Sequence, residues 1–179
     1  MVQMQVSQMA LSVADNASRL GQTDNSAVTP TVSETDVDSV LFGAMKQGTN
    51  FRFQENGRVI LSSLERDSFT GKQFIHWQRC KGNLTGQSSI YGNDSGNNGL
   101  GSGQNITGVG TTDGTVTAPA NSAVMVAEIY YRYSGIFGTM FTQQRTFRQQ
   151  ANLIIRDNRN LGATNTKGLS GTTIVASCN

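Results

Sequence analysis

Residues 123–133, AVMVAEIYYRY, restrict the possible folds more than any other part of the sequence. The run consists almost entirely of aliphatic and aromatic residues, which are enriched in β-strands. It is apolar on both sides of the alternation that a strand imposes, which is typical of a strand inside a sheet. We therefore expect a central strand. One face would carry Val124, Val126, Glu128, Tyr130 and Arg132, and the other Met125, Ala127, Ile129, Tyr131 and Tyr133.

A single carboxylate, Glu128, interrupts this apolar run. Because Arg132 falls on the same face, the two side chains can form one polar or ionic pair. The alternative is a partly exposed carboxylate on the edge face of a sheet. Four apolar residues then form a bend that would pack beneath the sheet or present an interface: Ile136, Phe137, Met140 and Phe141.

Two shorter runs earlier in the chain predict a hairpin. Residues 58–64 and 73–80 read as strands, and the polar residues 67–71 between them as a turn. Strict alternation would place Phe74, His76, Gln78 and Cys80 on one face of the second strand, and Ile75, Trp77 and Arg79 on the other.

Two helices are expected before these strands. Residues 2–20 carry apolar side chains at three- and four-residue steps, and Gly21 follows as a stop. The stripe consists of Val6, Met9, Val13, Ala17 and Leu20.

The second predicted helix covers residues 31–47 and ends before Gly48. Thr31 followed by Glu34 fits a capping box at its start, and Ser33 followed by Asp36 fits a rival one.

Residues 81–121 are rich in Gly, Asn, Ser and Thr and contain few large apolar side chains. Such a composition predicts a long surface loop or a flexible display segment. Residues 94–99, DSGNNG, have some likeness to a calcium loop, but they lack its alternating carboxylates, so ordinary turn chemistry is favoured.

The charge balance and the cysteines favour a secreted or cell-surface protein. The net charge of +2 gives no electrostatic case for nucleic acid, and only 15% of the residues are charged. In an oxidising compartment Cys80 and Cys178 would form a disulfide, whereas in the cytosol they would be separate thiols. The disulfide would close a loop of roughly 100 residues, which is worth about 4 to 5 kcal/mol in chain entropy.

No enzymatic site is predicted. His76 is the only histidine, so a multi-histidine metal site is excluded and any Ser/His/Asp triad would need this residue from within an apolar strand. Gly101 and Gly103 lack the strand, helix and lysine of a phosphate-binding loop. We therefore expect no catalytic residue, no metal, no cofactor and no small-molecule substrate.

The two strand-rich segments resemble those of TadE-like proteins, the minor pilins or pseudopilins of bacterial tight-adherence (Flp, type IVb) pili. The likeness covers residues 123–159, an aromatic strand with a glutamate, an aromatic bend and a final Arg156-x-x-Arg159 pair. It extends to residues 58–80, which end in Trp-Gln-Arg-Cys, and loosely to the first 20 residues. The family commonly has Arg-Pro-Arg where this chain has Arg-Asp-Asn-Arg, so the role of these arginines does not carry over directly.

This resemblance implies a single α+β domain over residues 1–179, pilin-like, with an N-terminal helix across an antiparallel sheet and residues 146–156 as a strand. It also implies a hydrophobic membrane helix upstream of residue 2, with Met1 not native. The alternative is a short native helix packed on the core. The protein would lie at the periplasmic face of the inner membrane or in the pilus and contact other pilus subunits and the assembly platform. The expected assembly contacts are Glu128, Tyr130, Arg132, Ile136, Phe137, Arg156 and Arg159.

The function implied is assembly of a pilus for surface attachment and biofilm formation. A second function class is a freestanding surface module that binds a glycan or a host molecule. It would use the loop of residues 81–121 together with Trp77, Tyr91 and Tyr130 as a stacking surface.

Overall fold

The computed structural model describes residues 2–21, 29–94, 106–111, 114–133, 144–156, 158–161, 168–171 and 176–178. The fold is α+β, as expected, with an N-terminal helix packed on a four-stranded antiparallel sheet of order β2-β1-β5-β6. The helices are α1 (Val2–Ser18), α2 (Glu34–Gln47), η1 (Thr49–Phe51) and α3 (Phe53–Asn56). The sheet consists of β1 (Gly57–Arg66), β2 (Gln73–Lys81), β5 (Ala123–Tyr133) and β6 (Arg145–Ile154), and β3 (Val109–Thr111) pairs separately with β4 (Gly114–Val116).

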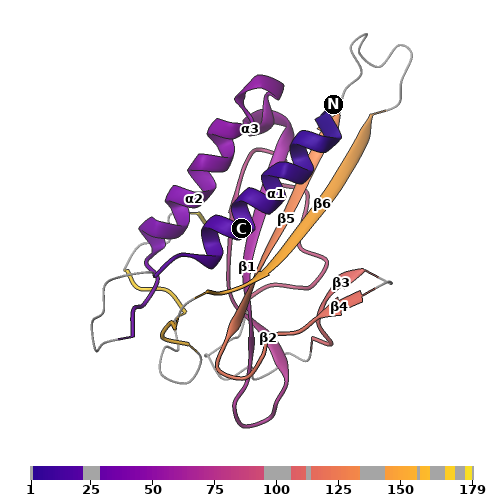
Figure 1. The fold of residues 1–179 in the computed structure, drawn as a ribbon. Coiled ribbons are helices and arrows are strands. Elements are labelled where there is room, and N and C mark those ends of the chain that lie inside the picture. Colours follow the sequence, from indigo (N-terminus) through magenta and orange to yellow (C-terminus); the bar gives the residue numbers. More distant parts are fainter. Residues whose placement is uncertain are drawn as a thin grey trace.

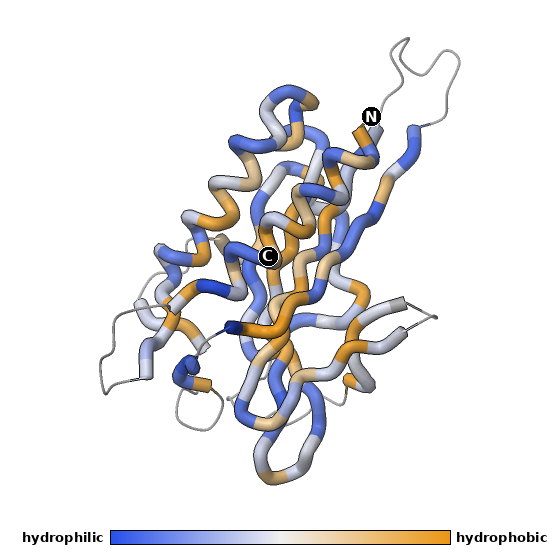
Figure 2. Tube along the Cα trace, in the orientation of Figure 1, coloured by the Kyte–Doolittle hydropathy of each residue, from blue (hydrophilic) through white to orange (hydrophobic). Residues whose placement is uncertain are grey.

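Helix α1 confirms the amphipathic pattern predicted for residues 2–20. Its apolar stripe is buried against β5 and β6, and Gly21 follows with a positive φ of 83°. Hydrophobic and hydrophilic residues alternate along both α1 and α2, which lie on one face of the sheet (Figures 1 and 2). No helix among the described residues is long and apolar enough to cross a membrane.

Helix α2 begins at the second of the two predicted caps. The Ser33 side chain accepts from the Asp36 backbone at 3.1 Å, and the Asp36 side chain accepts from the Ser33 backbone at 3.0 Å. The capping box of Thr31 and Glu34 is therefore wrong. The Glu34 carboxylate instead accepts a hydrogen bond from Arg79 Nε on β2 at 2.8 Å.

The hairpin of β1 and β2 is confirmed, but a β-bulge changes the predicted faces of β2. Ser63 pairs with Trp77 and Leu64 pairs with Ile75, so His76 has no register partner. Beyond the bulge, Gln78 contacts Ser62 on the face away from the helices. His76 and Trp77 both approach Gly168 instead of lying on opposite faces. A bulge carries one extra residue, which reverses the alternation on one side of it.

Strand β5 is central and its two faces divide as predicted. The face under the helices includes Met125, Ala127 and Ile129, whereas Val124 and Val126 belong to the core on the opposite side. The strand expected over residues 146–156 is confirmed as β6 as far as Ile154. The bend with Ile136 and Phe137 lies outside the described residues.

The second face of the sheet is covered by parts of the 81–121 region. Within this range, which was expected to be a long surface loop or a flexible display segment, β3 and β4 form a short antiparallel pair. Leu84 is buried with Ile60, Cys80 and Tyr130. Most of the segment 94–99 lies outside the described residues.

The disulfide between Cys80 and Cys178 is confirmed, and it spans 98 positions of sequence. It joins the end of β2 to the C-terminal segment, where Cys80 N also donates to the Ala176 carbonyl at 2.8 Å. A second part of this segment, at Ser170, bridges to Ser33 beside the start of α2. The C-terminal residues are thereby held against both the sheet and the helix layer.

Candidate functional site: a buried polar network around Glu128

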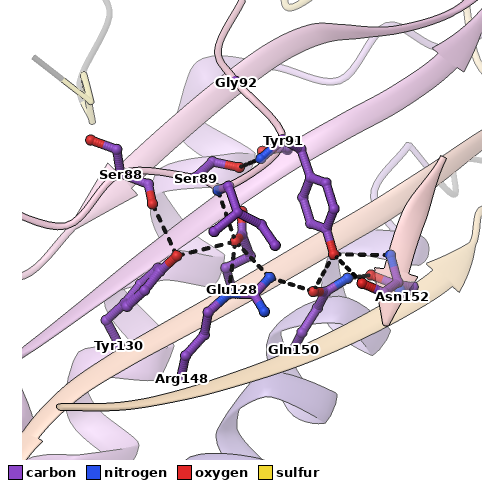
Figure 3. A network of polar contacts seen from close by, with 12 residues as sticks. Ser88, Ser89, Tyr91, Gly92, Glu128, Tyr130, Arg148, Gln150 and Asn152 are labelled. Carbon is purple, nitrogen blue, oxygen red and sulfur yellow. Dashed lines mark hydrogen bonds and ion pairs between the residues drawn. The ribbon is translucent and has the colours of Figure 1, made fainter. Parts of the chain in front are cut away.

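Glu128 lies in the middle of β5, on the face away from the helices, and its side chain has no exposed surface. The register of the sheet places it between Ile60 of β1 and Gln150 of β6. Burial of a carboxylate is costly unless a cation or hydrogen-bond donors compensate it. Glu128 is therefore the centre of a local polar network (Figure 3).

Arg148 of β6 compensates the charge. Its Nη2 and Nε lie 2.9 and 3.2 Å from the same oxygen, Oε1 of Glu128. Burial alone would lower the pKa of Arg148, but its contacts with Tyr91 and Glu128 and the negative charge of Glu128 raise it. The Arg148 guanidinium therefore keeps its charge beside the buried carboxylate. The other oxygen, Oε2, has no hydrogen-bond partner in the part of the chain that the structure describes.

Two tyrosines connect the Glu128–Arg148 pair to residues 88–91 and β3, which cover this face of the sheet. Tyr130 Oη donates to the Ser88 carbonyl at 2.9 Å and lies 3.4 Å from Glu128 Oε1. Burial, followed by the charge of Glu128, raises the pKa of Tyr130. Tyr91 Oη lies 2.7 Å from Gln150 Oε1 and accepts from the Gly110 backbone at 2.9 Å. Residues 88–91 and β3 are thus tied to the sheet.

The chain of contacts continues along β6. Arg148 Nη2 donates to Gln150 Oε1 at 2.5 Å, and Gln150 Nε2 donates to Asn152 Oδ1 at 2.8 Å. Because Glu128 has no accessible surface, it cannot touch a substrate while residues 88–91 are in place. The arrangement is suited to holding the covering segment on the sheet and not to acid–base chemistry.

The predicted pairing of Glu128 with Arg132 is wrong. Four residues along a strand correspond to about 13 Å, so residues i and i+4 are not neighbours as they are in a helix. Arg148 is instead directly diagonal across the β5–β6 ladder, since it pairs in register with Tyr130. It was not among the predicted site residues, because only the register identifies it.

The other predicted arginines hold α1 and lie apart from this network. The exposed Arg156 forms an ion pair with Asp15 of α1 at 2.7 Å. Arg159 is buried, and its Nη2 donates to the Ala17 carbonyl at 2.6 Å. Arg132 is partly exposed. Ile136 and Phe137 lie outside the described residues.

A second buried cluster surrounds His76. Its Nδ1 lies 2.8 Å from Glu65 Oε1, and the Ser63 hydroxyl donates to the same oxygen at 3.1 Å. In a catalytic triad the serine hydroxyl donates a hydrogen bond to the imidazole. Here the Ser63 hydroxyl and the His76 imidazole both contact the Glu65 carboxylate instead. His76 is therefore not placed to accept the proton of the Ser63 hydroxyl. Among the described residues, no group of three or more His, Cys, Asp or Glu could hold a metal ion.

Comparison of the chain with protein-family models, curated proteins and solved structures finds no match. Functional assignment therefore depends on the residues and contacts described above.

Proposed function

We propose that this protein is a minor pilin or pseudopilin that takes part in assembly of a tight-adherence, type IVb pilus. The main support is α1, whose apolar stripe lies along β5 and β6 while the disulfide fixes the C-terminal segment to the same sheet. This arrangement agrees with the sequence resemblance of residues 58–80 and 123–159 to TadE-like proteins. In this proposal a membrane helix precedes α1 and continues into it.

The outer side of α1 offers contacts for other subunits. Met4 and Leu11 are 60% and 57% exposed although both are large and apolar. They are seven residues apart, so they project from the same side of the helix. In the proposed function they contact neighbouring pilus subunits or the inner-membrane platform.

Glu128 and Tyr130 have a different role in this proposal than Arg132 and Arg156. The first two are buried and maintain the covering segment. Arg132 is partly exposed and Arg156 is exposed, so these two can reach a partner subunit. The assembly surface would thus use the exposed residues and depend on the buried ones for its shape.

The stacking surface of the alternative function does not form. Trp77 is buried in the core beneath the helices, whereas Tyr130 is buried on the opposite side of the sheet. Tyr91 is partly buried, and its hydroxyl is engaged by Gly110 and Gln150. A glycan-binding role would therefore need other residues.

The test is deletion and complementation in the source bacterium, with surface pili counted by electron microscopy. Deletion should abolish or strongly reduce piliation, and the whole reading frame should restore it. Met4→Ser with Leu11→Ser should not restore piliation, whereas Gln3→Ser with Gln8→Ser, two exposed polar residues of the same helix, should. Normal piliation after deletion would contradict the proposal.

A further inference from the structure

We propose that Arg58 forms a binding site for a small oxyanion, such as a carboxylate, sulfate or phosphate group. Arg58 is the second residue of β1, it is only 5% exposed, and it lines a cavity of about 140 Å³ on the face of the sheet away from the helices. That volume can hold several water molecules or one small anion. The site is separate from the pilus contacts proposed above.

The charge of Arg58 is compensated by no carboxylate in the described part of the chain. Its Nη2 donates to the Cys178 carbonyl at 2.7 Å, and its Nε has no hydrogen-bond partner among the described residues. Arginine stays protonated in proteins, and a buried charge without a counter-charge is costly. The buried Arg79 and the partly buried Arg148 are, by contrast, paired with Glu34 and Glu128.

The cavity wall supplies the groups that an oxyanion needs. Besides the guanidinium, the described part of the wall carries amide and hydroxyl groups, Ile60 and the disulfide, and it includes no carboxylate. Guanidinium groups bind carboxylate, sulfate and phosphate oxygens through charge-assisted hydrogen bonds. Exposed residues of the wall, Ser88 and Asn93, open it to solvent. The polar wall residues are Gln78, Gln87, Ser88, Ser89 and Asn93.

Two acidic residues in the adjoining segments contact arginines other than Arg58. Glu128, whose carboxylate lies below residues 88–91, is paired with Arg148. Asp94, at the end of the 84–94 segment, lies 3.3 Å from Arg79 Nη1. Neither carboxylate contacts Arg58 in the described part of the chain, and desolvation lowers the pKa of Arg58.

The disulfide contributes to the same site. Cys80 and Cys178 line the cavity, and the Cys178 carbonyl holds the guanidinium in place. The disulfide thus helps to hold the Cys178 carbonyl beside the guanidinium. An oxyanion would bind the oxidised protein.

The experiment is an NMR titration of the oxidised protein with sodium acetate, sodium sulfate and inorganic phosphate at constant ionic strength. The Arg58 Nε–H resonance should shift with a saturable, single-site curve for at least one anion. If acetate saturates the site at the lowest concentration, the preferred group is a planar carboxylate. If sulfate or phosphate does so, the preferred group is a tetrahedral oxyanion. A linear shift for all three anions would overturn the proposal.

Two substitutions at Ser88, which lines the cavity, test whether the anion binds there. Its side chain is exposed and its backbone carbonyl still accepts from Tyr130 in any variant, so both proteins should fold. Ser88→Asp should weaken the apparent affinity about tenfold or more by charge repulsion, and the neutral, similarly sized Ser88→Asn should leave it within about twofold. Equal affinities of the two variants would show that the anion does not bind in this cavity.

Discussion

The residue Glu128 illustrates how a carboxylate is accommodated in the middle of an apolar strand. It is fully buried, and a single cation from the next strand, Arg148, contacts one of its two oxygens. The sequence identified Glu128 as unusual because no other charged residue falls within residues 123–131. It could not identify Arg148, because the partner follows from the β5–β6 register and not from local spacing.

Loss of the Glu128 carboxylate should be strongly destabilising. Glu128→Ala leaves a cavity and an uncompensated Arg148, so we expect the free energy of unfolding to fall by about 3 kcal/mol in urea denaturation. A double-mutant cycle with Arg148→Ala should give a coupling energy of about 1 kcal/mol or more. The matched cycle with Arg132→Ala should give a value near zero. The reverse order of the two coupling energies would contradict the pairing.

Asp67 should produce a pH dependence at acidic pH. Its Oδ1 accepts from the backbones of Thr70 at 2.9 Å and Phe69 at 2.7 Å in the turn between β1 and β2. The Thr70 hydrogen bond is the main reason that the pKa of Asp67 lies below its ordinary value of 3.8, and it outweighs desolvation, which acts in the opposite direction.

The stability that Asp67 contributes is therefore complete above the unfolded-state pKa and is lost as the pH falls through the lower folded-state pKa. Asp67→Asn should lower the melting temperature at pH 6, and the difference from the wild type should shrink as the pH falls below 3.8. Thermal unfolding followed by circular dichroism at several pH values measures this. A difference that grows on acidification would have the wrong sign.

At the scale of elements, long periodic segments were predictable and short ones were not. The helix over residues 2–20 and the strands over 58–64, 73–80 and 123–133 carry their own hydrophobic pattern. The three-residue strands β3 and β4 and the four-residue α3 are too short to show a period. The bulge at His76 has no local signal, since no glycine marks it.

At the scale of elements, a substitution tests whether Ser33, and not Thr31, caps α2. Ser33→Ala removes the side-chain acceptor of the capping box and should lower the free energy of unfolding by about 1 kcal/mol. The same change inside the helix at the exposed Ser39 should have no destabilising effect, because alanine favours a helix. Chemical denaturation compares the two variants. Equal losses would show that Ser33 does not cap the helix.

For the whole molecule, the main feature is a sheet that is covered on both faces. Helices α1 and α2 lie on one face, and parts of the 81–121 region and Cys178 lie on the other. This explains why β5 is apolar on both sides. The polar composition of residues 81–121 did not predict that this region covers the sheet. Its buried contacts are made by a few apolar residues, such as Leu84 and Val109.

The disulfide should account for a large share of the global stability. Replacing Cys80 and Cys178 together by serine frees a loop of about 100 residues, so we expect a loss of about 4 kcal/mol in urea denaturation. Wild-type protein under reducing conditions should unfold at the same urea concentration as the double variant. A loss below about 1 kcal/mol would mean that the C-terminal segment is held mainly by its other contacts.

The most direct test of the proposed pilin function is to read the native coding sequence immediately upstream of Val2. The proposal predicts about 20 apolar residues that run without interruption into VQMQVSQMALSV. The protein would then be anchored in the membrane with α1 as the continuation of its membrane helix. A native start at Met1, or a cleavable signal peptide at this position, would contradict the proposed architecture.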